Sequence, residues 1–205
     1  MISEIQHGYV KRPTHKTRVY DEDRFEVCNH KWSALCEGNR GAAILNNCKY
    51  GISAERGTMS LTLLTSPMRP TKDGDHGIHK FTYSFMPFSE NIADSSVQYE
   101  AYDLNCPVKT APGYADTKSL IGLSEKNIIL DTVKFAEDGS GDIVVRMFES
   151  TNSRTNCKFS FGFDIKSACL TNMIETTRSD VEVENNAISL TFNPFEVITL
   201  RLSIE

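Results

Sequence analysis

Two acidic residues and two histidines lie within seven consecutive positions, Asp73–His79, which read DGDHGIH. Aspartate and histidine are ordinary ligands of zinc and manganese, so this spacing could hold a divalent metal. The surrounding segment, Ser66–His79, contains two prolines and two glycines, which predict a loop. Because no further cluster of ligand residue types accompanies the four side chains, a solvated loop is the favoured interpretation.

The single tryptophan, Trp32, lies two positions after His30, which places both side chains on one face of a strand. Such a pair could stack on a sugar ring. A lone tryptophan more often anchors a β-sandwich core, with the histidine hydrogen-bonded beside it. The core position is therefore the favoured interpretation of Trp32.

The elements that must position these residues read as strands. The stretch Arg24–Gly51 predicts two strands joined by a glycine-rich reversal. The loop separates two apolar strands, Thr58–Leu64 and His79–Phe85, and the segment 95–104 predicts a further strand. From Cys106 to Ser119 the composition changes to proline, glycine and small polar residues, which predicts a domain boundary.

The second half has a cleaner β pattern. Lys158–Phe163 alternates polar and apolar residues, and hairpin turns are predicted at 136–142 and at Asn185–Asn186. No periodic helix of ten or more residues is visible. We therefore expect an all-β fold of two β-sandwiches, with domains 1–111 and 112–205.

Composition and charge narrow the classes of function. The net charge of −5 and the isoelectric point near 5.6 argue against nucleic-acid binding, which needs a basic face. No apolar run approaches the roughly 20 residues that span a bilayer, and the first residues lack an apolar signal core. The six cysteines contain no Cys-x-x-Cys pair, so we expect reduced, buried thiols in a cytoplasmic protein without membrane contact.

Several longer stretches are more informative about function through their exact residues than through their polar and apolar pattern. In the first half they are Arg12–His15 (RPTH), Phe25–Leu35 (FEVCNHKWSAL), Gly41–Gly51 (GAAILNNCKYG) and Gly77–Tyr83 (GIHKFTY). In the second half they are Leu130–Gly139 (LDTVKFAEDG), Arg146–Glu149 (RMFE) and Pro194–Leu202 (PFEVITLRL). Taken in this order, they resemble the C-terminal half of α-mannosidases of glycoside hydrolase family 38. The chain departs from that pattern at Thr17–Asp21 (TRVYD), where the family continues with Asn-Thr-Ser-Trp-Asp.

The resemblance carries expectations about fold and chemistry. It implies that residues 1–111 form the end of a large mutarotase-like super-sandwich and that 112–205 form a small terminal β-sandwich. Family members are retaining glycosidases with two catalytic carboxylates and a zinc ion, all held in an N-terminal domain. None of the motifs that hold those groups occurs here. We therefore expect a non-catalytic C-terminal part of an α-mannosidase, inactive alone and without a cofactor of its own.

The same resemblance suggests roles for two sets of polar residues. The loop could project towards the catalytic domain, where it would touch a sugar or a neighbouring loop. Its candidate contact residues are Arg69, Asp75, His76 and His79. Arg12 and His15, which flank Pro13 and Thr14, could form an inter-domain contact, and a plain surface loop is an equal alternative.

Three classes of function follow. In the leading hypothesis the chain packs on a catalytic domain and shapes the mouth of a site that accepts a mannose-containing glycan. A free-standing carbohydrate-binding β-sandwich is the alternative, and a metallohydrolase that uses Asp73–His79 is the third. Apolar surface left exposed would favour the first hypothesis and could drive the chain to form a homo-oligomer.

Overall fold

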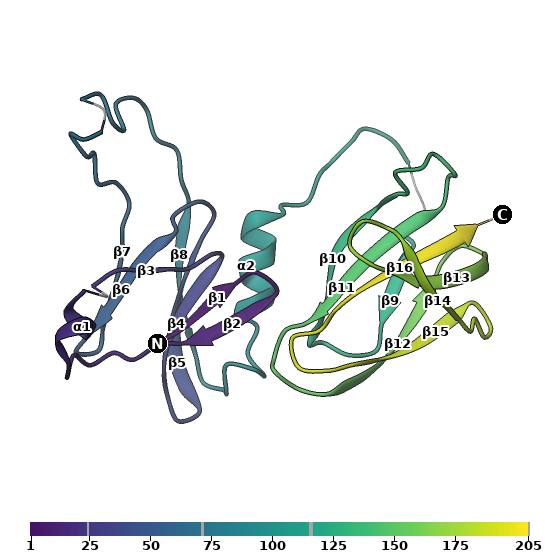
Figure 1. The fold of residues 1–205 in the computed structure, drawn as a ribbon, viewed down its shortest axis with the longest axis horizontal. Coiled ribbons are helices and arrows are strands. Elements are labelled where there is room, and N and C mark those ends of the chain that lie inside the picture. The colour runs from purple at the N-terminus through teal and green to yellow at the C-terminus, as the bar shows by residue number, and fades with distance from the viewer. Residues whose placement is uncertain (24, 71, 115–116, 205) are drawn as a thin grey trace. The chain divides into compact units, whose positions relative to one another are not determined.

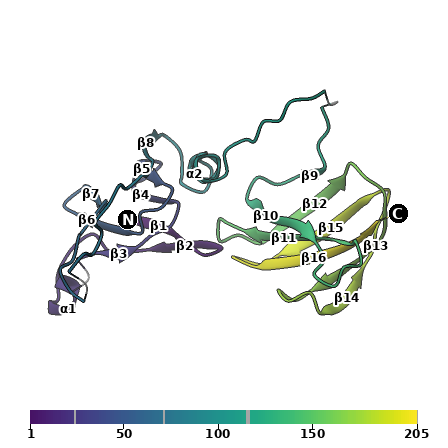
Figure 2. The same ribbon diagram turned by 90° about the horizontal axis from the view of Figure 1, so that it is seen from above.

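The computed structural model describes residues 1–23, 25–70, 72–114 and 117–204. They divide into two compact units, Met1–Ala111 and Pro112–Glu205, which we take one at a time (Figures 1 and 2). Strands make up most of the regular structure, so the predicted all-β fold class is confirmed. No helix among the described residues is long and apolar enough to cross a membrane.

The first unit contains two antiparallel sheets and a packed helix. Its elements are β1 (Ile2–Ile5), β2 (Gly8–Lys11), α1 (Val19–Glu22), β3 (Val27–Cys28), β4 (Trp32–Glu37), β5 (Arg40–Asn46), β6 (Gly51–Glu55), β7 (Thr58–Leu61), β8 (Tyr83–Phe88) and α2 (Val97–Asn105). The larger sheet has the order β2-β1-β4-β5-β8, and the smaller has the order β3-β6-β7. The strand β7 ends earlier and the strand β8 begins later than the sequence predicts. The loop between them is therefore longer than expected.

One face of the larger sheet is covered by α2. Val97 and Ala101 of this helix are completely buried and pack with Trp32 and Leu45. The Trp32 side chain is only 2% exposed, and its indole N–H donates a hydrogen bond to Gln98 Oε1 at 2.9 Å. The preferred interpretation of Trp32 as a core anchor is confirmed.

The prediction of a strand over 95–104 is wrong, because this segment forms α2. Val97, Ala101 and Leu104 recur at spacings of four and three, which places them on one face of a helix. In a strand, Leu104 would point away from the other two. All three pack into the core cluster of this unit, which only the helical arrangement permits.

The second unit is an antiparallel β-sandwich. Its elements are β9 (Ile121–Leu123), β10 (Ile128–Phe135), β11 (Ile143–Glu149), β12 (Thr155–Phe161), β13 (Ile165–Thr171), β14 (Thr177–Val181), β15 (Ala187–Phe192) and β16 (Val197–Ile204). A sheet of order β10-β11-β16-β13-β14 and a sheet of order β15-β12-β9 enclose one core (Figure 2). Its largest completely buried side chains include Phe159, Phe192 and Leu200.

The predicted turn at Asn185–Asn186 lies where expected, but it does not close a hairpin. Both asparagines adopt left-handed backbone angles, with φ of 50° and 59°. The flanking strands belong to different sheets, since β14 pairs with β13 and β15 pairs with β12. The turn therefore carries the chain from one layer of the sandwich to the other, with a single bridge between Glu184 and Ala187.

A completely buried carboxylate, Glu149, lies at the end of β11. Its Oε1 accepts hydrogen bonds from Asn127 Nδ2 (3.0 Å), Thr151 N (2.7 Å) and Thr151 Oγ1 (2.6 Å). Its Oε2 accepts from Ser153 N and Phe195 N, each at 3.1 Å. Because these donors come from three separate segments, one side chain fixes how the segments meet.

Burial alone raises the pKa of Glu149, and this is the largest single influence on the group. The hydrogen bonds from Thr151, Phe195 and Ser153 together outweigh it, so the pKa lies below its ordinary value. A lowered pKa contributes stability that is complete above the unfolded value near 4.5. That stability is lost as the pH falls through the folded value.

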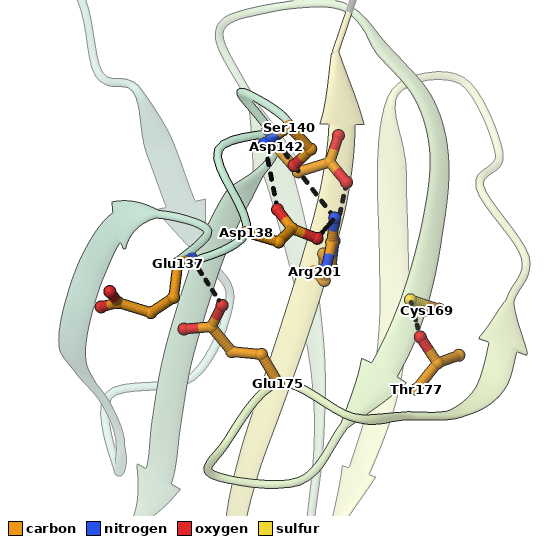
Figure 3. Close-up of polar contacts among 8 residues, drawn as sticks. All are labelled: Glu137, Asp138, Ser140, Asp142, Cys169, Glu175, Thr177 and Arg201. Atoms are coloured by element: carbon orange, nitrogen blue, oxygen red, sulfur yellow. Dashed lines mark hydrogen bonds and ion pairs between the residues drawn. The ribbon is translucent and has the colours of Figure 1, made fainter.

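An arginine on β16 holds the turn between β10 and β11 (Figure 3). The Arg201 guanidinium donates through Nε to Asp142 Oδ2 and through Nη2 to Asp138 Oδ2, both at 2.7 Å. The backbone N–H and side chain of Ser140, together with Arg201, lower the pKa of Asp138 to about 2. Asp138 therefore stays charged further into the acidic range than an ordinary aspartate, and its contact with Arg201 attaches the predicted turn to the sheet.

All six cysteines are unpaired in the structure. Cys157 is buried in the core of the second unit, as expected of a small apolar side chain. The expectation of burial fails for the cysteines that sit at outward positions or near strand and helix ends, which are Cys28, Cys36, Cys48 and Cys106.

Replacing Glu149 with glutamine should lower the free energy of unfolding by about 2–3 kcal/mol at pH 7. The substitution removes the negative charge. It also replaces one accepting oxygen by an NH2 group, which cannot accept hydrogen bonds from the surrounding N–H donors. Chemical denaturation followed by circular dichroism measures the effect. The deficit should shrink as the pH falls below the unfolded value near 4.5 and through the lower folded pKa, where the wild-type carboxylate protonates.

Glu182→Gln is the matched control, because Glu182 is exposed and lies outside this network. It should change the free energy of unfolding by less than about 0.5 kcal/mol. Equal stabilities of the wild-type and Glu149→Gln proteins at pH 7 would contradict the role given to Glu149.

Candidate functional site

The long loop between β7 and β8 contains four of the six candidate site residues (Figure 1). Asp75 Oδ2 accepts a hydrogen bond from Ser66 N at 3.0 Å, and the Ser66 hydroxyl donates to Gly74 O at 3.2 Å. His79 Nε2 lies 2.8 Å from Asp75 O. These contacts close the loop on itself, so Asp75 and His79 hold its shape. All four candidate residues of the loop are exposed.

The loop does not bring together a metal site. The shortest contact between its acidic and imidazole groups is 3.8 Å, from His76 Nδ1 to Asp73 Oδ1. Within residues 1–23, 25–70, 72–114 and 117–204, no three His, Cys, Asp or Glu side chains converge as ligands. In the described conformation the loop therefore does not bring a set of zinc ligands together.

Arg12 and His15 lie elsewhere, in a pocket of about 480 Å³. One wall is the segment that follows β2, and the other comes from Phe25 and from Ser53–Glu55 of β6. The Arg12 Nη2 group donates to Cys28 O at 2.9 Å. Its Nε is buried and finds no hydrogen-bond partner among the described residues. Arg12 therefore lines a pocket of ligand size, while its Nε donor stays enclosed and unpaired.

The acidic residues of this pocket already have partners. The backbone N–H of Thr17 donates to Asp21 Oδ2 at 3.1 Å and is the main cause that lowers the pKa of Asp21. Lys16 Nζ forms an ion pair with Glu55 Oε2 at 3.3 Å. Two further basic residues, Lys11 and Arg12, also line this pocket.

The segment that departs from the family string, Thr17–Asp21, leads into the short helix α1. Tyr20 is the aromatic residue available in place of the family's Trp. The guanidinium carbon of Arg18 lies over its ring, 5.5 Å from the ring centroid. Its phenol also accepts a hydrogen bond from that arginine. Tyr20 does not line the pocket, so Phe25 supplies the aromatic wall there.

Sequence reasoning grouped Arg12 with His15, and the structure places both in one pocket. Sequence reasoning missed the opposite wall, Ser53–Glu55, because only the packing of β6 brings these residues next to Arg12 and His15. It also missed Phe25. The side chain of Phe25 is 69% exposed, which its apolar character does not predict. The loop residues are not among those that line this pocket.

Comparison with known proteins identifies the class. Residues 1–73 match the family model "Glycosyl hydrolases family 38 C-terminal domain", and residues 127–200 match "Glycosyl hydrolases family 38 C-terminal beta sandwich domain". Together with the two β-rich units, these matches define the C-terminal β region of a glycosidase family. The chain belongs to glycosyl hydrolase family 38.

Relatives cover almost the entire chain. It is 35% identical to "Alpha-mannosidase 2C1" of Homo sapiens over 98% of its length, and 38% identical to "Alpha-mannosidase G" of Dictyostelium discoideum over 97%. The chain spans only 20% and 19% of those proteins. A solved α-mannosidase from Enterococcus faecalis V583 has the same fold, with a TM-score of 0.79 at 19% identity over 98% of this chain and 24% of that one.

Proposed function

We propose that this chain is the non-catalytic C-terminal part of a retaining α-mannosidase that acts on α-linked mannose in glycans. The observation that carries the proposal is 35–38% identity, over nearly the whole chain, to proteins named as α-mannosidases. Because the chain spans about a fifth of those relatives, the catalytic machinery belongs to the remaining four fifths. The carboxylate pair and zinc are expected there, and we expect this chain to be inactive alone.

The partner in this proposal is the N-terminal catalytic domain. Support comes from exposed apolar side chains on and around β8, where Tyr83 is 57% and Phe85 is 68% exposed. The nearby loop adds Met68 and Ile78, which are 78% and 93% exposed. Apolar groups in such number usually mark an interface, which can also lead to a homo-oligomer when the natural partner is missing.

A free-standing carbohydrate-binding module is the alternative. Trp32 cannot serve this hypothesis as a sugar-stacking residue, because its side chain is buried. One other observation favours the hypothesis. Phe81 and Tyr83 stack at 6.4 Å between ring centroids with an interplanar angle of 22°, and Phe85 continues the same strand face. This aromatic row could take a sugar instead of a protein domain, and only an experiment separates the two uses.

Within the leading proposal, Arg12 and His15 contact the catalytic domain or the glycan at the mouth of its site. Arg69, Asp75, His76 and His79 contribute the second contact region through the projecting loop. The guanidinium of Arg12, which lines the pocket, suits an acceptor oxygen from either source. We also place the enzyme in the cytoplasm, which stays a prediction.

Depletion of a cell extract with an antibody against this chain tests the function. We expect hydrolysis of aryl α-mannosides to be removed together with the chain, because both reside in one polypeptide. The same depletion with a non-immune antibody is the control. Full α-mannosidase activity in an extract that no longer contains the chain would overturn the proposal.

The role of Arg12 is tested in the full polypeptide that carries this chain. Arg12→Ala should lower kcat/KM for a mannose oligosaccharide about tenfold, as expected for a lost charged hydrogen bond of about 1.5 kcal/mol. Arg178→Ala is the matched control, since Arg178 is exposed on β14 of the other unit. Kinetics unchanged in Arg12→Ala and in His79→Ala would remove both contact regions from the proposal.

A further inference from the structure

A second pocket of about 370 Å³ lies where several elements of the first unit end. Its lining surface is more apolar than polar, but several lining residues carry hydrogen-bonding groups: Cys28, His30, Lys31, Asn46, Asn47, Tyr50 and Asn105. Asn46 is the last residue of β5 and Asn105 the last of α2, whereas Lys31 and Tyr50 directly precede β4 and β6. The volume lies at the lower end of the range for small-molecule pockets.

The base of this pocket is held rigidly by a buried amide. Asn46 is completely buried, and its Nδ2 donates to Asn29 Oδ1 at 3.1 Å and to His30 O at 2.8 Å. Its Oδ1 accepts from Lys49 N at 2.7 Å, and its backbone carbonyl accepts from Asn105 Nδ2 at 3.0 Å. The walls are therefore fixed before any ligand arrives, which lowers the entropic cost of binding.

The charge balance of the pocket points to a neutral ligand. Lys31 contributes a formal charge, and Glu4 neutralises it through a contact of 2.9 Å between Nζ and Oε1. Glu4 Oε2 also accepts from Lys31 N, and the ammonium lies 4.4 Å from the centroid of the Tyr102 ring. The other wall residues named above are uncharged when histidine is neutral, so an anion would find no uncompensated cation.

Other groups of the pocket have hydrogen-bonding capacity left over. Tyr50 is 58% exposed, and its ring meets the His30 ring edge-on at 5.7 Å. The Tyr50 hydroxyl and the His30 ring nitrogens make no hydrogen bond within the part of the chain that the structure describes. Asn47 uses its Oδ1 to accept from Thr82 N at 2.9 Å, which leaves the Nδ2 hydrogens available.

We propose that this pocket binds one neutral pyranose residue of a glycan. An aromatic ring can pack against the C–H face of a pyranose, while the phenol, imidazole and amide groups exchange hydrogen bonds with its hydroxyls. The choice of a mannose residue rests on the proposed function. In that setting the pocket would hold part of the glycan without taking part in bond cleavage. His30 thus has a binding role after all, with Tyr50 rather than Trp32 as its partner.

Titration of the 205-residue chain with methyl α-D-mannopyranoside, followed by ¹H–¹⁵N nuclear magnetic resonance, tests this inference. We expect saturable shifts of the Asn47 side-chain amide and of the backbone around Tyr50. Tyr50→Ala should weaken binding about tenfold or more, because the ring and its hydroxyl are both lost. Asn47→Asp should do the same, since it keeps the acceptor for Thr82 and removes the amide donor.

Tyr114→Ala is the control, because Tyr114 is 94% exposed and lies outside the pocket. It should bind the sugar as the wild type does, and thermal unfolding should show that all three variants are folded. Absence of saturable shifts, or wild-type affinity in folded Tyr50→Ala, would overturn the inference. If the antibody depletion removes α-mannosidase activity but the sugar does not bind, this inference fails while the proposed function stands.

Discussion

The buried carboxylate of Glu149 determines how the second unit closes at one end of its sandwich. A charge removed from water is tolerated only when donors surround it, and five hydrogen bonds from Asn127, Thr151, Ser153 and Phe195 do so. The backbone N–H of Glu149 also donates to Glu196 O at 3.1 Å. The strings RMFE and PFEVITLRL, far apart in sequence, therefore meet at this one group.

Asn46 has the corresponding position in the first unit. Its buried amide joins the strings FEVCNHKWSAL and GAAILNNCKYG, because it bonds to Asn29, to His30 O and to Lys49 N. In both units the most recognisable strings thus contain a polar side chain that closes the ends of sheets. This use is structural, and it agrees with a chain that supports a catalytic centre rather than forming one. At Asn46 the same scaffolding also leaves a pocket beside it.

Much of the fold could be predicted because the two faces of a strand appear in the sequence as alternating polar and apolar residues. Lys158–Phe163 alternates, and in its part within β12 Phe159 and Phe161 are buried while Lys158 and Ser160 are exposed. The helix α2 was missed because nine residues show only two helical turns of pattern, and packing on Trp32 decides its state. For the site, residue types identified the loop and the pairing of Arg12 with His15. They could not reveal that the donors to Glu149 are mostly backbone groups, or that β6 completes the Arg12 pocket.

The central claim, that this chain works as one end of an α-mannosidase polypeptide, is tested most directly by its native size. An immunoblot of source cells with an antibody against the second unit measures it. We predict a band of about five times the 23.0 kDa of this chain, since the chain spans 20% of the human relative. A single band at 23.0 kDa, with no larger species, would contradict the claim.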